Sequence, residues 1–208
     1  MRQKLTYLLC ICLLLAALAG CGGEKRNLVG TWTGTMDLTQ SVGEQVSAAL
    51  GAELSQWFTV PELKIACTMT FTAKGTYRLE PEEDSVALAV ENIRKTLAGQ
   101  LTAYLEDRLR KQGNFLSAEE YLEAQGTNLD NLLDQAIAEN AARDILNQAA
   151  LSGNFSVKQD KLLLSHGEKA KPDAQLYYSY TLEENTLCIR QGTGDLDFPC
   201  PLTLTRSA

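Results

Sequence analysis

The stretch that decides the fold is Val29–Thr39, which reads VGTWTGTMDLT. Trp32, Met36 and Leu38 fall on one face of this stretch together with Gly34, and polar side chains fall on the other face. Strict alternation of apolar and polar residues is typical of a β-strand that buries one face. The same alternation recurs farther along the chain, so this strand is expected to be the first of a series.

Seven further short stretches alternate in the same way, which gives eight predicted strands in all. They lie within 63–79, 154–165, 174–190 and 201–206, and the hairpin turns are expected at Lys74-Gly75, Gln159-Asp160 and Glu184-Asn185. Eight antiparallel strands of this kind close into a barrel that is filled by side chains or holds one small ligand. A curved sheet with helices on its apolar face would bury the same residues. The prediction is therefore a mainly β fold with an α insertion (α+β), built as a barrel or a curved sheet.

Two regions are predicted to be helical. Residues 42–58 have apolar side chains at helical spacing, and residues 82–150 are rich in Ala, Leu, Glu and Gln. Within 82–150 the sequence predicts three helices: a long one ending near Gly113, a short one opened by a capping box at Ser117–Glu120, and a third opened by a similar capping pattern at Thr127 and Asp130. The apolar stripe of the third helix contains Leu129, Leu133, Ile137, Ala141 and Ile145.

The first residues of the chain have the features of an export signal. Arg2 and Lys4 precede an apolar run, Leu5–Leu18, which is shorter than the ~20 residues needed to span a bilayer. The run ends in Leu-Ala-Gly-Cys at Leu18–Cys21, and this order resembles a bacterial lipoprotein signal with its lipobox.

That resemblance implies cleavage before Cys21 and a diacylglycerol on the sulfur of that cysteine. Residues 1–20 would then be the signal peptide, 21–26 a lipidated tether, and 27–208 the folded domain, interrupted by the helical insertion at 82–150. The mature protein would be held on the extracytoplasmic face of the cell membrane, because two or more acyl chains anchor a protein stably.

Charge excludes one class of partner. The signal removes two of the 19 basic residues, so 17 face 26 acidic ones and the mature chain has a net charge of −9. Nucleic-acid binding needs a basic footprint, which this chain lacks. Residues 81–150 contain 13 acidic and 6 basic side chains, a net charge of −7, so most of the negative charge lies in the helical insertion.

Three cysteines remain after the signal and the lipidated residue are set aside: Cys67, Cys188 and Cys200. Alternation places Cys188 and Cys200 on opposite faces of their strands, which disfavours a disulfide between them. We expect three free thiols that pack as small hydrophobic side chains.

Gly30-Thr31-Trp32 at the start of an eight-strand series resembles the G-x-W signature of lipocalins and lipocalin-like bacterial domains. In that family the tryptophan packs across the closed end of the barrel, and a basic residue at the end of the last strand stacks on it. The resemblance assigns these roles to Trp32 and Arg206. A helical insertion departs from the family pattern, as does the absence of its central T-D-Y motif, so the resemblance does not supply a ligand.

The inward faces supply the residues that would line a cavity or fill a core: Trp32, Met36, Met69, Phe71, Tyr77, Phe155, Tyr178 and Tyr180. A ligand among them would be small and largely apolar. We find no catalytic constellation, cofactor motif or metal-ligand set, since His166 is the only histidine and no G-x-S-x-G, H-E-x-x-H or C-x-x-C is present. The first hypothesis is a non-enzymatic, lipid-anchored ligand binder or scaffold; the alternative is an interaction module that acts through the acidic helices.

Overall fold

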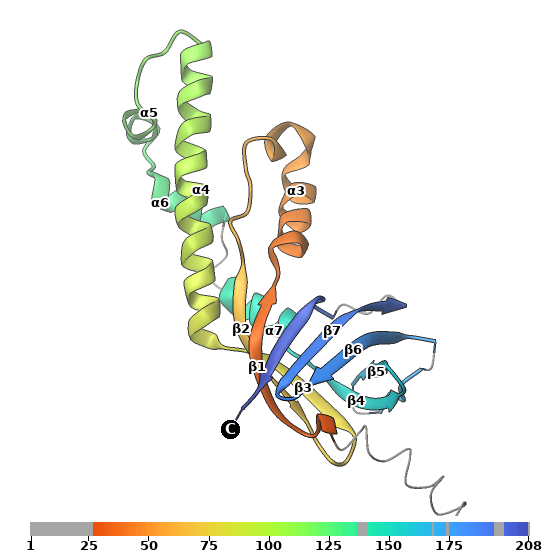
Figure 1. The fold of residues 1–208 in the computed structure, drawn as a ribbon. Helices are drawn as coiled ribbons and strands as arrows, with labels where there is room; N and C mark the ends of the chain where they lie inside the picture. Colours follow the sequence, from red (N-terminus) through yellow and green to blue (C-terminus); the bar gives the residue numbers. More distant parts are fainter. Residues whose placement is uncertain (1–26, 137–140, 168, 174, 194–197, 208) are drawn as a thin grey trace, which may run out of the picture. The chain divides into compact units, whose positions relative to one another are not determined.

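The computed structural model describes residues 27–136, 141–167, 169–173, 175–193 and 198–207. Its eight strands form a closed antiparallel barrel in the order β1-β2-β3-β4-β5-β6-β7-β8, so each strand pairs with its neighbour in the sequence (Figure 1). The predicted α+β fold is confirmed, and of the two predicted arrangements the structure has the barrel. The predicted signal and lipobox at 1–21 and the predicted tether at 21–26 lie outside the described residues.

The strands and helices have the following bounds. The strands are β1 (Gly30–Asp37), β2 (Lys64–Phe71), β3 (Thr76–Pro81), β4 (Leu151–Lys158), β5 (Lys161–His166), β6 (Tyr177–Glu183), β7 (Thr186–Thr193) and β8 (Leu202–Arg206). The helices are α3 (Thr39–Ser55), α4 (Glu83–Lys111), α5 (Ala118–Ala124), α6 (Leu129–Ala136) and α7 (Ala141–Ala149).

The first strand meets the last one closely. The backbone N–H of Ser207 donates to the carbonyl of Thr31 at 2.9 Å. A Cβ on Gly34 would lie 2.3 Å from the carbonyl oxygen of Thr203, which is closer than any real Cβ contact. Only glycine fits at this inward position, and its missing side chain allows β1 and β8 to approach.

The hairpins follow the predicted turns. Gln159 and Glu184, each the first residue of a two-residue turn, have positive φ angles of 59° and 48°. Such turns match the right-handed twist of the strands that they join. In the β4–β5 ladder Phe155 faces Leu164, so the alternating apolar residues of the two strands share one face.

The helix after β1 begins earlier than predicted. The side chain of Asp37 accepts the N–H of Thr39 at 2.9 Å, and α3 runs over Thr39–Ser55 instead of 42–58. A carboxylate that accepts a backbone N–H at a helix start is a capping interaction, and the apolar spacing alone did not reveal it. Trp57, which was predicted on the helix, follows its end and packs edge-on against Tyr104 at 5.6 Å between ring centroids.

The long helix α4 ends close to the predicted position, and Gly113 follows with φ +74°. The capping box at Ser117 and Glu120 is present and opens α5. The predicted cap at Thr127 is wrong, because Asn128 accepts the N–H of Asn131 at 2.8 Å and is therefore the residue that caps α6.

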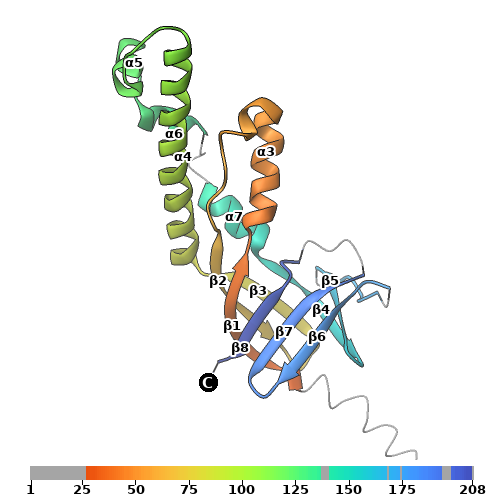
Figure 2. The same ribbon diagram turned by 45° about the horizontal axis from the view of Figure 1, so that its top comes forward.

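Where one third helix was predicted, the described residues hold two, α6 and α7. Ile137 of the predicted stripe lies outside the described residues. Arg94 of α4 forms ion pairs with Asp130 and Asp134 of α6, and α5 and α6 lie beside α4 (Figures 1 and 2).

Contacts divide the chain into two compact units. Of the described residues, one unit contains those within 27–34, 68–79 and 151–207, and the other contains those within 35–67 and 80–150. The second unit, which we call the helical unit, therefore includes α3 and the ends of β1 and β2 in addition to the predicted insertion at 82–150. Among the described residues, none of the helices is long and apolar enough to cross a bilayer.

Candidate functional site

Trp32 lies in the interior of the barrel unit and has no exposed surface. Its indole N–H donates to the carbonyl of Leu28 at 2.8 Å, in the segment that precedes β1. A buried indole needs such a partner, because an unpaired polar group in an apolar interior is costly. Trp32 therefore ties the chain before β1 to the barrel core.

Arg206, the last residue of β8, lies over the Trp32 ring with its guanidinium carbon 4.3 Å from the ring centroid. Its Nη1 donates to the carbonyl of Val29 at 3.0 Å, and its Nη2 donates to the carbonyl of Asn27. The planar guanidinium is suited to stacking and to hydrogen bonding at the same time. One side chain thus joins the last strand to the segment before the first.

Gly30 leaves room for this arrangement. Its φ of +139° is a conformation that side chains rarely adopt, and a Cβ at this position would lie 3.0 Å from the Nη1 of Arg206. The glycine and the tryptophan of the G-x-W stretch are therefore both needed for the contact with Arg206. Gly30 leaves space for the guanidinium, and the Trp32 ring stacks on it.

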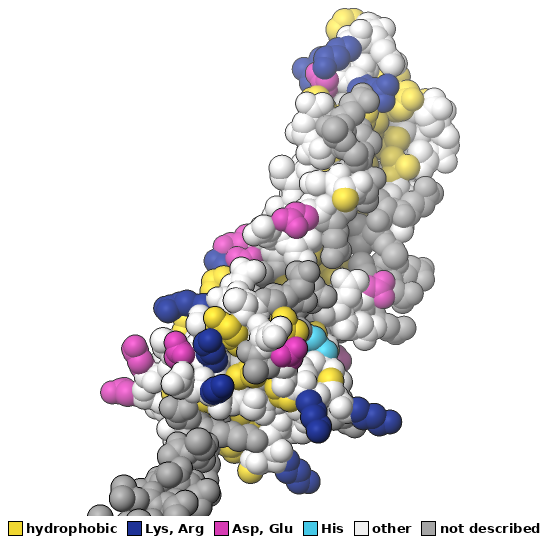
Figure 3. Space-filling model, turned by 90° about the vertical axis from the view of Figure 1, so that its right-hand side faces the viewer, with side chains coloured by type: hydrophobic (Ala, Val, Ile, Leu, Met, Phe, Trp, Pro, Cys, Tyr) yellow, Lys and Arg dark blue, Asp and Glu magenta, His cyan; other side chains and the backbone are white. Residues whose placement is uncertain are grey.

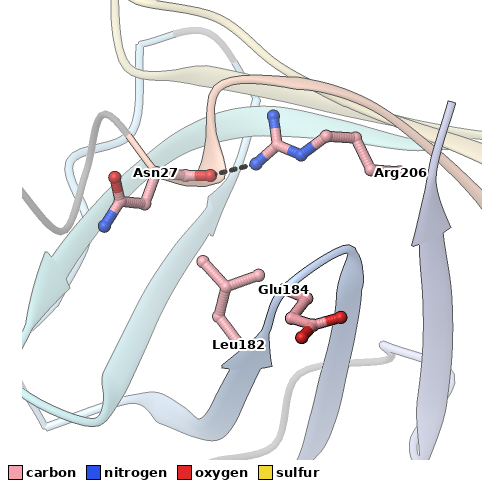
Figure 4. A pocket seen from close by; sticks show the side chains of 4 residues that line it. All are labelled: Asn27, Leu182, Glu184 and Arg206. Carbon is pink, nitrogen blue, oxygen red and sulfur yellow. Dashed lines mark hydrogen bonds between the residues drawn. The ribbon is translucent and has the colours of Figure 1, made fainter. Parts of the chain in front are cut away.

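A pocket of about 430 Å³ opens at this end of the barrel (Figure 4). It is lined by Asn27, Leu182, Glu184 and Arg206, with Leu182 and Glu184 coming from the β6–β7 hairpin. Arg206 is already engaged with two backbone oxygens, and a carboxylate shares the same walls. That combination disfavours an anionic ligand, so we assign Arg206 a structural role here.

The eight residues predicted to line a cavity or fill a core are nearly all buried. Trp32, Met36 and Met69 have no exposed surface, Phe71, Tyr77, Phe155 and Tyr178 are at most 4% exposed, and Tyr180 is half-buried. Except for Tyr180, these side chains are enclosed, and none of the eight lines the pocket beside Arg206.

Within the barrel unit the aromatic side chains contact one another. The rings of Phe71 and Phe155 meet edge-on at 4.8 Å between centroids, and Phe71 also lies 6.5 Å from Tyr77. Tyr178 packs at 5.1 Å against Phe198, a residue that the sequence did not single out because it lies on no alternating stretch.

The fully buried side chains of the interior show whether a cavity lies beside them. A void that admitted a water molecule would leave accessible surface on the side chains around it. Trp32, Met69, Leu162, Leu187, Leu202 and Leu204 have none. Around these residues the barrel is filled by its own side chains.

Two polar groups meet near the β3–β5 region. The hydroxyl of Tyr77 lies 3.3 Å from Nδ1 of His166, and burial raises the pKa of Tyr77 to about 12. His166 is itself exposed at the end of β5. Alternation put Tyr77 on the inner face, but nothing in the local sequence indicated its contact with a histidine 89 residues away.

The three cysteines Cys67, Cys188 and Cys200 are free, as predicted. Burial, with a smaller contribution from Cys188, raises the pKa of the Cys200 thiol to about 12. A thiol with so high a pKa is a poor nucleophile. Among the described residues no group of three or more His, Cys, Asp or Glu side chains is arranged to hold a metal ion.

Comparison of the chain with protein-family models, with curated proteins and with solved structures found no match. The class of the protein is therefore defined by its fold: an eight-stranded antiparallel barrel, lipocalin-like in architecture, with a helical unit inserted in it.

Proposed function

We propose that this chain is a non-enzymatic, lipid-anchored protein of the extracytoplasmic face, in which a filled barrel serves as a scaffold that displays the helical unit. The observation that carries the proposal is the packing of the barrel interior. Lipocalin-like barrels with a binding function keep space for a ligand. In this chain the interior of the barrel unit is occupied by Trp32, Met69 and Phe71, which are at most 1% exposed.

The helical unit has the properties of a working surface. Its helices hold most of the net negative charge of the mature chain. Such a surface repels anionic partners and attracts cationic ones. In the part of the chain that the structure describes, the large hydrophobic side chains that are exposed are Leu88, Phe115 and Leu116, and all three belong to this unit. Phe115 and Leu116 are adjacent just after the end of α4, whereas Leu88 lies near its start, so they mark two separate places on this unit.

The proposed anchor would fix how the barrel is held. Five residues separate Cys21 from Asn27, so the six peptide steps between them span at most ~20 Å when fully extended. Asn27 is bound by Arg206 at the end of the barrel where Trp32 is buried. That end of the barrel would therefore face the lipid. The contacts of Arg206 with Trp32 and with the backbone of Asn27 would hold the chain at the point where the tether enters the barrel.

Substitution of the proposed lipid acceptor tests the anchor. Cys21→Ser removes the sulfur that would carry the diacylglycerol, so the protein is expected to move from the membrane fraction to the soluble fraction of fractionated cells. Cys12→Ser is the matched control, because it changes a cysteine of the signal and leaves Leu18–Cys21 intact. Membrane attachment of the Cys21→Ser protein at the level of the control would refute the anchor.

A further inference from the structure

The end of α4 differs in charge from the rest of the helical unit. Residues 108–116, which we call the tip, read RLRKQGNFL and contain three basic side chains and no acidic one. The remaining residues of 81–150 contain 13 acidic and 3 basic side chains. Basic and hydrophobic side chains lie together at this end of the unit (Figure 3). The tip is therefore a small basic and apolar surface on an otherwise acidic unit.

Two adjacent hydrophobic side chains of the tip are exposed to solvent. Phe115 is 86% exposed and Leu116 is 43% exposed. The turn that carries them is held by hydrogen bonds: the N–H of Asn114 donates to the carbonyl of Leu109 at 2.9 Å, and the N–H of Leu116 donates to the Asn114 side chain at 3.1 Å. Because this turn is already ordered, the two side chains can enter an apolar phase with little further loss of conformational entropy.

The basic side chains of the tip remain accessible although they have partners in the chain. Arg110 is 66% exposed beside Glu106, and Lys111 is 71% exposed beside Asp107. Arg108 is exposed as well. Residues of a helix are displaced by about 100° from one to the next, so these three side chains surround the end of α4 and do not line one side of it. A ring of cations around an apolar pair is complementary to an anionic surface that is met end-on.

Two half-buried aromatic side chains lie beside the same end of α4. Trp57 and Tyr104 pack at 5.6 Å between ring centroids. The ammonium of Lys111 lies 5.9 Å from the centroid of the Trp57 ring, and Arg108 donates to the Tyr104 hydroxyl at 2.9 Å. Trp and Tyr side chains are favoured at the level of lipid headgroups, because one part of each is apolar and the other is polar.

The acidic surface of the helical unit is too far from the tip to prevent contact with an anionic surface. Glu91 precedes Arg108 by 17 residues, a rise of about 25 Å along α4. Salt at physiological concentration screens exposed charges over about 8 Å. The chain turns back after the tip, so the acidic helix α5 lies beside α4 (Figure 1). The acidic side chains therefore favour an approach in which the tip comes first.

We infer that the tip inserts into the headgroup region of a bilayer that contains anionic phospholipids. Phe115 and Leu116 enter the boundary of the acyl chains, while the basic side chains contact lipid phosphates, a role for which guanidinium groups are well suited. Such binding depends on the apolar area that is buried and on attraction to anionic lipids. The inference names the partner of the helical unit, so it rests on the interaction function proposed above. The contact is distinct from the proposed lipid on Cys21.

Vesicle titration tests the inference. The mature chain carrying Cys21→Ser, and therefore no lipid, is titrated with vesicles of equal parts phosphatidylglycerol and phosphatidylcholine while tryptophan fluorescence is recorded. We expect a blue shift from Trp57, since Trp32 is already fully buried. Vesicles of phosphatidylcholine alone are expected to bind about tenfold more weakly or less, because each basic residue adds to the attraction of an anionic membrane. Phe115→Ser is expected to weaken binding about tenfold, since it removes the largest apolar side chain of the tip.

The controls separate the tip from folding and from the rest of α4. Leu88→Ser removes a 58% exposed side chain near the start of α4 and is expected to leave vesicle binding unchanged. Circular dichroism is expected to be the same for both serine variants, because neither side chain is buried. Arg108→Gln combined with Arg110→Gln is expected to abolish the preference for phosphatidylglycerol. In the Trp57→Phe protein the blue shift is expected to disappear while the protein still sediments with vesicles.

Three results would overturn the inference: no binding to phosphatidylglycerol vesicles, equal affinity of the parent and the Phe115→Ser protein, or an equal loss of affinity with Leu88→Ser. The first would mean that the tip meets a protein or a polymer and not a bilayer. Each of these results would leave the anchor and the filled barrel standing, because the titrated protein has no lipid and the substitutions lie outside the barrel unit.

Discussion

Trp32 contributes to stability through its burial, its hydrogen bond to Leu28 and the stacked guanidinium of Arg206. Trp32→Ala is expected to lower the free energy of unfolding by about 3–5 kcal/mol, the usual cost of removing a large core aromatic. Denaturant unfolding followed by circular dichroism measures the change. A loss below about 1 kcal/mol would mean that the barrel does not depend on this residue.

Trp57 is the matched control for that substitution. It is half-buried in the helical unit and packs against Tyr104, so Trp57→Ala is expected to cost clearly less than Trp32→Ala. If the two changes have equal effects, the special role assigned to the Trp32–Arg206 contact is wrong.

Because Tyr77 is buried, the free energy of unfolding is expected to fall at alkaline pH. Its pKa rises from 10.0 to about 12 in the folded chain because the hydroxyl is buried. The neutral form is therefore favoured in the folded state, and its contribution is complete below pH 10.0 and is lost as the pH rises toward about 12. Unfolding titrations between pH 10.0 and about 12 are expected to show a smaller loss of stability for Tyr77→Phe than for the parent.

The roles of single residues were only partly predictable. Alternation is local, so the inward positions of Trp32 and Tyr77 followed from the sequence. The contact between Arg206 and the backbone of Val29 joins residues 177 positions apart, and no local pattern specifies such a contact. That pairing was expected only from the family resemblance of Gly30–Trp32.

Among the secondary-structure elements, β1 and β8 form the contact that closes the barrel. Gly34→Ala would place a Cβ 2.3 Å from the carbonyl oxygen of Thr203, so the strands must separate. We expect a loss of about 1–3 kcal/mol, as overpacked sites show. Denaturant unfolding gives the value.

Gly43→Ala in α3 is the control, because a Cβ there meets no atom within 4 Å. Alanine is favoured over glycine in a helix by about 1 kcal/mol, so this change is expected to be neutral or stabilising. Equal destabilisation by the two alanines would contradict the close approach of β1 and β8.

The elements themselves were largely predictable from the sequence, and their ends were less so. Period-2 alternation and two-residue turns defined the hairpins because both signals lie within a few residues. The start of α3 depends on the side chain of Asp37, which apolar spacing alone did not reveal. The residue that caps α6 is Asn128 and not the predicted Thr127, although the apolar stripe placed the start of this helix correctly at Leu129. The division into two units depends on contacts between distant segments and was not predicted in full.

At the scale of the whole molecule, we propose a barrel that serves as a scaffold and a helical unit that interacts with a partner. The sequence left open whether the barrel holds a ligand, because side chains that line a cavity and side chains that fill a core have the same pattern. Packing favours a filled core, since Phe71 contacts both Phe155 and Tyr77 inside the barrel unit.

Native mass spectrometry of residues 22–208, purified from the organism that makes the protein, tests the filled barrel most directly. The account predicts that each polypeptide has the mass of its sequence alone, whether it is present as one copy or two. A small molecule that is bound in a fixed ratio to each copy, and that is released when the chain is denatured, would contradict the scaffold function. It would show that the barrel binds a ligand.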